Sequence, residues 1–480
     1  MSAKLKLSAI VAAWGSVISC SAWAIEFPYM WQDPLLTRPN VLELGAALPS
    51  DRASLACGLQ NSAHHNLNVK DPLALETAVD MALCHNPQVS AAWAAIKVQA
   101  GALGEARAAF LPTLNATASK LSNNTRYTDG TFPDTSNSGK TKYANLTWRL
   151  FDFGTRTANL ESANQLLTAA MASHNAALQK VLTSVVGAYF DAMTAQAAVT
   201  ARTQAVHLAT STLQTTRRRE ARGVAAASDT LQAAAALARA QLTLSRAQGE
   251  AQKTRAVLMY VMGLNFDAQL ILPDEHAANQ EVRVQDLAQW FKEAQTKHPA
   301  IAAARAQLAA SKAKVLVIEA EGLPTVDYTQ NHYQNGYPNQ GLSSTNSKVN
   351  TVGFTLTMPL FEGFARTYRV RGAQAQTEQS EAQLQETELQ ILMELVKAHA
   401  DAQSAFDSLQ GSQHLLTATE AAVQSSQHRY DKGAADILEL LSAQNALADA
   451  QQERVRCLSD WRSARLRLMS SAGVLGRDGL

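Results

Sequence analysis

The sequence offers few residues arranged for catalysis or metal binding. His64 and His65 form an isolated pair in a polar stretch, which is more typical of solvated side chains than of a metal site. Gly101 and Gly104 lie in an expected helix and suit close packing better than phosphate binding. None of the motifs G-x-S-x-G, H-E-x-x-H and C-x-x-C occurs in the 480 residues. We therefore expect no enzyme, no cofactor and no metal site.

One pair of acidic residues stands out by its spacing. Asp229 follows Gly223 by six residues, and Glu439 follows Gly433 by six. Carboxylates gathered around one opening would attract cations. Acids in the first turn of a helix are also favoured by the helix dipole alone, so both interpretations stay open.

The first 24 residues are typical of a secretory signal peptide. Lys4 and Lys6 precede an apolar run from Leu7 to Ile18, and Ala22-Trp23-Ala24 forms an A-x-A cleavage site. Cleavage there would start the mature chain at Ile25. The alternative is a lipoprotein signal, because Val17-Ile18-Ser19-Cys20 resembles a lipobox that would place a lipid on Cys20.

The remaining cysteines are Cys57, Cys84 and Cys457. In an oxidising compartment Cys57 and Cys84 are expected to form a disulfide that ties an N-terminal arm, residues 25–72, to the first helix. Two unpaired buried thiols are the alternative. Cys457 lies within an expected helix and is interpreted as a small apolar residue.

Composition favours long helices over a compact enzyme. The formal net charge is +1, charged residues make up 17% and aromatic residues 6%, and much of the 46% hydrophobic content is alanine. Such a balance gives no overall field to attract nucleic acid, which we exclude as a partner. Alanine-rich, aromatic-poor stretches suit closely packed helices.

The chain contains an internal repeat. The segments that recur at an offset of 210 to 212 residues are Asn86-Pro87 with His298-Pro299, Leu111-Pro112-Thr113 with Leu323-Pro324-Thr325, Leu150-Phe151-Asp152 with Leu360-Phe361-Glu362, and Gly223 with Gly433. Two copies of one unit therefore cover 73–264 and 285–475. Residues 265–284 are interpreted as a linker and 476–480 as a short tail.

Each unit predicts two helices broken at a proline, two strands, a long helix and a returning helix. Period-two alternation predicts strands at 112–122, 142–153, 324–334 and 348–361, and a turn-rich loop at 123–141. The helix from 155 to 222 would be about 100 Å long. Apolar residues repeat every seven positions in the second copy, at Leu395, Ala402, Leu409, Leu416, Val423 and Tyr430, as in a coiled coil.

A sheet of four strands with one apolar face is not stable in a membrane by itself, because its two edge strands would lack partners. An open sheet in a membrane would leave two unpaired edges, whereas three chains would supply twelve strands to one barrel. We therefore expect a mostly α-helical chain with a membrane β-barrel, trimeric and 12-stranded, continued by an α-helical coiled-coil tunnel in the periplasm. The alternative is an ordinary α+β protein whose strands are covered by helices.

The repeat resembles the TolC outer-membrane efflux family. The helix breaks at Asn86-Pro87 and His298-Pro299, the Leu-Pro strand starts, the Leu-Phe-Asp/Glu strand ends and Arg429-Tyr430-Asp431-Lys432-Gly433 carry the resemblance across about 70–475. The Cys57/Cys84 pair and the short tail resemble the type I secretion branch. The resemblance implies a homotrimer in the outer membrane that docks to a periplasmic adaptor and an inner-membrane ABC transporter, or alternatively an RND pump.

The resemblance also implies roles for residues near the two glycine turns. It places a channel constriction at Asp229, Glu439, Ser442 and Tyr430, where Ser442 replaces a second acidic residue and Tyr430 matches the gate tyrosine. Ala435 stands where an arginine would hold the closed state, so the gating network must differ. The helical turns at Gly223 and Gly433, with Arg218, Arg222 and Lys432, would dock the adaptor, although basic residues at a helix end also suit the helix dipole.

These observations predict an exit duct, most simply for type I secretion of a protein such as a toxin. Small-molecule or multidrug efflux is the alternative within transport. A trimeric coiled-coil adhesin is the alternative from another class, but its barrel would lie at one terminus. Here the strands lie inside each repeat.

Overall fold

The computed structural model describes residues 72–129, 133–264, 270–273, 286–334 and 347–475. The predicted signal peptide with Cys20, almost all of the N-terminal arm with Cys57, most of the linker and the tail lie outside the described residues.

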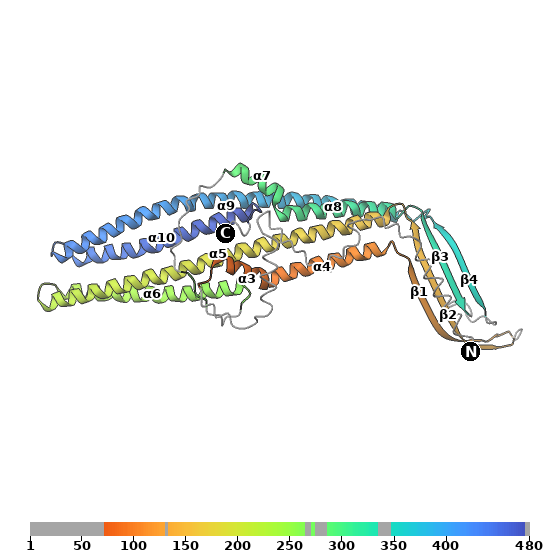
Figure 1. Ribbon diagram of the computed structural model, residues 1–480, viewed down its shortest axis with the longest axis horizontal. Coiled ribbons are helices and arrows are strands. Elements are labelled where there is room, and N and C mark those ends of the chain that lie inside the picture. Colours follow the sequence, from red (N-terminus) through yellow and green to blue (C-terminus); the bar gives the residue numbers. More distant parts are fainter. Residues whose placement is uncertain (1–71, 130–132, 265–269, 274–285, 335–346, 476–480) are drawn as a thin grey trace, which may run out of the picture. The chain divides into compact units, whose positions relative to one another are not determined.

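The two halves of the chain repeat one order of elements. The first half has α3 (Leu75–His85), α4 (Pro87–Ala108), β1 (Thr113–Thr125), β2 (Thr135–Phe151), α5 (Thr155–Ala221) and α6 (Ala227–Val261) (Figure 1). The second half has α7 (Leu287–Lys297), α8 (Pro299–Ala320), β3 (Thr325–Gln334), β4 (Lys348–Thr357), α9 (Ala365–Asp431) and α10 (Ile437–Ser471). This order confirms the predicted internal repeat.

The helix breaks lie where the sequence placed them, and a side chain caps each second helix. The Asn86 side chain accepts a hydrogen bond from the Gln88 amide at 2.8 Å at the start of α4. At the start of α8, His298 Nδ1 accepts from the Ala300 amide at 3.2 Å. Proline follows the cap in both cases, where its missing N–H removes no helical bond.

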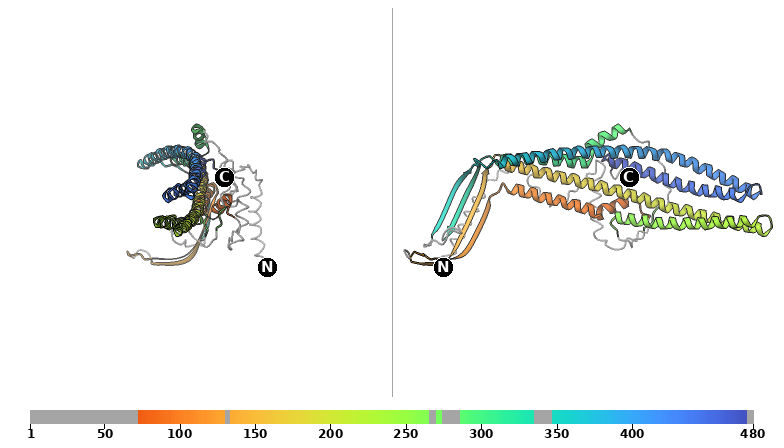
Figure 2. Two further views of the ribbon diagram at one scale, coloured as in Figure 1. Left: turned by 90° about the vertical axis from the view of Figure 1, so that its left-hand side faces the viewer. Right: turned by 180° about the vertical axis from the view of Figure 1, so that it is seen from behind.

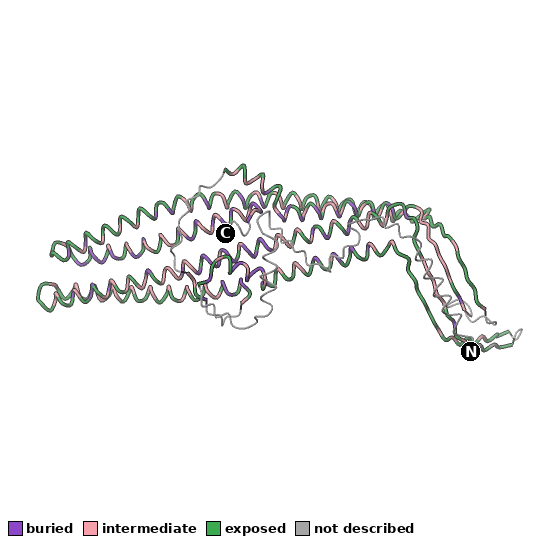
Figure 3. The backbone as a smooth tube through the Cα atoms, viewed as in Figure 1, coloured by how far each residue is buried: buried purple, intermediate pink, exposed green. Residues whose placement is uncertain are grey.

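The helices α5 and α9 have 67 residues each, which corresponds to about 100 Å. Leu395, Ala402, Leu409 and Tyr430 of the predicted seven-residue seam are buried, and the purple stretches in Figure 3 follow such stripes along the helices. α9 packs on α10, α10 on α5, and α5 on α6; α8 packs between α5 and α9 beyond the end of α10. The end-on view in Figure 2 shows α9, α10, α5 and α6 in one layer.

The strands form one antiparallel sheet in the order β1-β2-β3-β4. Polar residues share one face, where Asn145 pairs with Asn331 and Arg149 with Asp327. Apolar residues share the other face, and most of them are exposed: Leu114 70%, Val352 57%, Phe354 71%, Leu356 70% and Met358 56%. β1 and β4 are the edges, each paired on one side only among the described residues.

The first hairpin is longer than the sequence predicted. β2 begins at Thr135 rather than 142, and β1 continues to Thr125, so much of the predicted loop at 123–141 is strand. This extension is polar, with Asn124 opposite Ser136, and hydrophobic alternation cannot reveal it. β4 instead ends at Thr357, earlier than predicted, just before Pro359, which has no N–H for the ladder.

No helix within the described ranges is both long enough and apolar enough to cross a membrane.

Candidate functional site

Each long helix ends in a tight turn that starts the returning helix. Gly223 and Gly433 have φ of 72° and 74°, a left-handed conformation that glycine adopts without steric cost. In the first turn the Gly223 amide donates to Glu220 O and the Val224 amide to Arg219 O, at 2.8 and 3.0 Å. The second turn repeats both bonds, which together form a Schellman motif.

The two hairpins are joined at their tips by Arg219 and Tyr430. The Arg219 guanidinium carbon lies 4.5 Å from the centroid of the Tyr430 ring. Its Nη1 donates to the Tyr430 carbonyl at 2.8 Å. The ring itself is buried with Ile437, Leu440 and Leu441. Burial raises the pKa of the Tyr430 hydroxyl, and Arg219 opposes the shift.

The predicted carboxylates lie close to this contact, but they differ in their partners. Glu439 is exposed, and its Oε1 accepts from Arg429 Nη1 at 2.8 Å. Asp229 is half-buried in the first turn of α6, and its carboxylate accepts only from Ser228 Oγ, at 3.3 Å, among the described residues. Ser442 is exposed one turn after Glu439.

The repeat makes this asymmetry informative. Arg219 and Arg429 occupy the same slot in the two copies, 210 residues apart. Arg429 pairs within its own hairpin, whereas Arg219 crosses to the other hairpin. In the sequence, Arg219 is one of three consecutive arginines, Arg217 to Arg219, at the end of a helix, and nothing local distinguishes it from the other two. The signal that could have singled it out is an arginine four residues before the turn glycine in both copies.

The residues expected to dock an adaptor are exposed. Arg218, Arg222, Gly223, Lys432 and Gly433 all lie on the outside of the two turns. Arg218 Nε donates to Gln214 O of its own helix at 3.2 Å. The turns therefore present cationic side chains at the ends of both hairpins.

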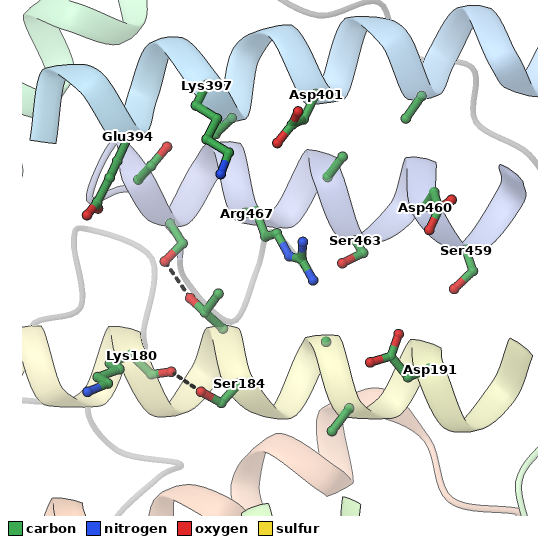
Figure 4. A pocket seen from close by; sticks show the side chains of 18 of the residues that line it. Lys180, Ser184, Asp191, Glu394, Lys397, Asp401, Ser459, Asp460, Ser463 and Arg467 are labelled. Atoms are coloured by element: carbon green, nitrogen blue, oxygen red, sulfur yellow. Dashed lines mark hydrogen bonds between the residues drawn. The ribbon is translucent and has the colours of Figure 1, made fainter. Parts of the chain in front are cut away.

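A polar hollow of about 1410 Å³ lies between α5 and α9 over α10. Charged side chains of both signs from all three helices line it, among them Lys180, Asp191, Lys397, Asp401 and Arg467 (Figure 4). Small residues such as Ser184 and Ser463 separate them. The hollow is thus lined by charges of both signs and by hydroxyl groups.

The cysteines and potential metal ligands carry no catalytic arrangement in the described ranges. Cys84 is disulfide-bonded, and its predicted partner Cys57 lies outside the described residues. Cys457 is a buried free thiol in α10, as its sequence context indicated. No three His, Cys, Asp or Glu side chains of the described chain are grouped to hold a metal ion.

Comparison with known proteins decides the family. Residues 78–264 and 290–474 each match the family described as "Outer membrane efflux protein". The chain belongs to the outer membrane efflux protein family. The two matches coincide with the two copies of the repeat. The chain is also 36% identical over 407 residues to Protein CyaE of Bordetella pertussis, covering 85% of both chains.

Solved structures show that the fold is that of outer-membrane channels. The outer-membrane channel OprN superposes with a TM-score of 0.74 at 23% identity, covering 84% of this chain and 90% of OprN. The outer membrane protein VceC of Vibrio cholerae gives 0.71 at 24% identity, covering 83% and 96%. The MtrE outer membrane channel of Neisseria gonorrhoeae, in its open state, gives 0.67 at 18%, covering 85% and 90%.

The outer membrane efflux protein family is a family of transport channels, so this chain is an outer-membrane channel protein. Its long helices and its four-stranded sheet are the elements that it shares in fold with those channels. The predicted family, the mostly helical fold with a four-stranded antiparallel sheet, and the outer-membrane location are thus confirmed.

Proposed function

We propose that this efflux-family protein is the exit duct of a type I secretion system, and that three copies close one channel. The observation that carries the closure is the open sheet. Its apolar face is exposed and its β1 and β4 edges lack a second neighbour among the described strands. Pairing β4 of one chain with β1 of the next removes every edge, and twelve strands result.

The same closure gives each face of the sheet a consistent environment. The face with Leu114, Phe354 and Leu356 contacts lipid. The face with Asn145, Arg149 and Asp327 lines a wet lumen, where Arg149 Nε donates to Asp327 Oδ1 at 2.9 Å. We assign the mixed charges of the hollow between α5 and α9 to the same polar lining further along the duct.

The hairpin tips form the periplasmic end of the duct. Both long helices start at the sheet and end at Gly223 and Gly433, so the two tips lie at one level and bring Arg219 to Tyr430. We assign Asp229 and Glu439 to the constriction there and the exposed Arg218, Arg222 and Lys432 to contact with a periplasmic adaptor. An inner-membrane ABC transporter would supply the energy, since this chain has no nucleotide motif.

Protein secretion is favoured over drug efflux by two observations. The chain is more similar to Protein CyaE, at 36% identity, than to the superposed channels at 18 to 24%. Cys84 is disulfide-bonded, and a Cys57/Cys84 pair is a feature in which the sequence resembles the type I branch. Small-molecule efflux is the second candidate, because the family description itself names efflux.

A deletion strain distinguishes the two. Removing the gene and restoring it on a plasmid should abolish and recover the appearance of a large glycine- and aspartate-rich protein in the medium, while drug susceptibility stays unchanged. A plasmid carrying Leu356→Arg, which blocks assembly on this proposal, is the matched negative control. Unchanged secretion with increased drug susceptibility would assign the duct to a multidrug pump instead.

A further inference from the structure

Where β4 meets α9, the chain exposes a row of aromatic side chains followed by an arginine. Phe361, Phe364 and Tyr368 are 78%, 69% and 69% exposed, and Arg371 is also exposed. Phe361 and Phe364 precede α9, and Tyr368 and Arg371 lie three residues apart in its first two turns, so these two side chains are neighbours on the helix surface. Phe361 and Phe364 touch edge to face, with ring centroids 5.8 Å apart. Nothing in the described residues covers this row.

The backbone keeps one of these rings exposed at a cost. Phe364 has φ of 64°, a left-handed conformation. This conformation is energetically unfavourable for any residue that has a Cβ atom. The first repeat places Phe153, with φ of 52°, at the corresponding junction between β2 and α5. An exposed phenylalanine with a left-handed backbone thus occurs at both junctions, so the two repeats share this feature.

Arg371 differs from the two arginines beside it. Arg366 pairs with Glu362 at 3.1 Å, and Arg369 pairs with Glu321 and Glu362 at 3.1 and 3.2 Å. Arg371 pairs with no carboxylate among the described residues; its guanidinium carbon lies 5.9 Å from the Tyr368 ring. The site therefore combines an unpaired cation with an aromatic face, which fits an anionic ligand with an apolar body.

The position relative to the sheet specifies the ligand further. The exposed apolar residues Phe354, Leu356 and Met358, at or just after the end of β4, precede this row by only a few residues in the chain. α9 begins at Ala365, so Arg371 lies about 9 Å further along the helix axis. The headgroup layer of a bilayer leaflet is about 5 to 8 Å deep, and helical side chains lean toward the N-terminus, here toward the membrane. The guanidinium thus reaches the phosphate level.

We propose that Phe361, Phe364, Tyr368 and Arg371 bind an anionic phospholipid of the periplasmic leaflet. The aromatic rings lie at the boundary between acyl chains and headgroups, and Arg371 binds the phosphate. The first repeat lacks the pair, because Ala158 and Glu161 stand 210 residues before Tyr368 and Arg371. Each chain therefore has one such site and a trimer has three.

Native mass spectrometry of the purified trimer tests the proposal. The detergent-solubilised protein is incubated with equal amounts of phosphatidylglycerol and phosphatidylcholine, and bound lipids are counted. The parent protein should retain phosphatidylglycerol preferentially, up to three per trimer. Arg371→Gln should weaken that retention about fivefold, as expected for one surface cation near anionic lipid. Tyr368→Ala should weaken it as well.

Two controls and two contrary outcomes complete the experiment. Arg239→Gln removes an exposed cation from α6, and Glu161→Gln changes the corresponding position of the first repeat; neither should alter retention. Equal retention by Arg371→Gln and the parent would overturn the proposal. So would dissociation of the Arg371→Gln trimer, which would show that this face contacts a second copy. The inference rests on the proposed membrane wall, whose own failure would appear as normal assembly of Leu356→Arg.

Discussion

The Arg219 guanidinium lies over the Tyr430 ring, 4.5 Å from its centroid, and joins the tip of one helical hairpin to the tip of the other. The same side chain donates to the Tyr430 carbonyl at 2.8 Å. A charge-assisted hydrogen bond is typically worth about 1.5–3 kcal/mol, and a partly buried cation–π contact adds about 0.5–2 kcal/mol. Ala435 has no charged side chain that could link the two hairpins. The contact between Arg219 and Tyr430 is therefore the strongest candidate for holding the tips together.

Replacing Arg219 with alanine should therefore favour the open channel. We expect the open probability in planar bilayers to rise about tenfold or more, because roughly 2 kcal/mol of inter-hairpin contact is lost. Arg218→Ala is the matched control, since Arg218 is exposed and donates to its own helix. An equal effect of the two substitutions would mean that net charge at the tip, rather than the contact with Tyr430, controls opening.

Tyr430 itself should act through its ring and not through its hydroxyl. The hydroxyl is buried and has no hydrogen-bond partner within the described residues. Tyr430→Phe should therefore leave the open probability unchanged or slightly lower it, whereas Tyr430→Ala should open the channel as Arg219→Ala does. A large opening effect of Tyr430→Phe would assign the hydroxyl a role that this arrangement lacks.

The tip carboxylates should contribute unequally to ion selectivity. Glu439 is paired with Arg429 at 2.8 Å, whereas Asp229 has no basic partner among the described residues. Asp229→Asn should lower the cation preference, measured as a reversal potential in a salt gradient, more than Glu439→Gln does. Arg429→Gln should raise the preference by releasing Glu439. Unchanged selectivity in the double variant of Asp229 and Glu439 would return both residues to a helix-capping role.

The membrane wall should tolerate a charge on one face of β4 only. Leu356→Arg places a cation on the exposed apolar face, which costs about 2–4 kcal/mol near the bilayer midplane. Thr355→Arg points to the opposite face, opposite Asp327 in the β3–β4 register. Heat-stable trimers on unboiled gels should disappear for the first variant and persist for the second. Normal trimers in both variants would exclude a lipid-facing strand.

Acidification should weaken the start of α8 but not the start of α4. Burial lowers the pKa of His298 from the ordinary 6.5, and Glu394 opposes the shift. The neutral ring is thus favoured in the folded state, so its stabilisation is complete above about pH 6.5 and is lost as the pH falls through the lowered value. Protonation also removes the acceptor that caps Ala300 N.

The first repeat supplies the variant for this test, because Asn86 caps α4 with an amide that does not titrate. His298→Asn should keep a cap worth about 1 kcal/mol at every pH. The loss in melting temperature between pH 7.5 and pH 5 should be smaller in His298→Asn than in the parent protein. An identical loss would place the pH sensitivity at other groups, such as the half-buried His174, whose pKa is also lowered by burial.

The order of helices and strands could be predicted from the sequence because the signals for each element occur in both copies of the repeat. Proline and glycine positions placed the ends of α3, α5, α7 and α9 within one or two residues, since both residue types act through local backbone geometry. The polar extension of the β1–β2 hairpin was missed because its pairing has no hydrophobic period. The role of Arg219 could not be predicted from the sequence, because its contact with the other hairpin depends on the tertiary structure. The neighbouring Arg217 and Arg218 are the same residue type but do not make this contact.

Substituting the glycines that end the returning helices should destabilise the protein more than substituting the glycines at the hairpin tips. Gly433 and Gly473 share a left-handed φ of 74°, so alanine at either site costs about 1–2 kcal/mol in backbone strain. A Cβ on Gly433 would meet nothing within 4 Å, whereas one on Gly473 would lie 2.8 Å from His298 Cα. Overpacking against that backbone adds about 1–3 kcal/mol.

Gly473→Ala should therefore lower the melting temperature clearly more than Gly433→Ala, with circular dichroism at 222 nm as the readout. The first repeat offers the same comparison, because a Cβ on Gly263 would lie 2.8 Å from His85 O while Gly223 has open space. In both repeats the glycine at the end of the returning helix should be the more sensitive one to substitution, since α6 and α10 each end against the helix break of their own repeat. Equal destabilisation within both pairs would mean that these contacts relax freely, and the helix breaks would then contribute little to holding the returning helices in place.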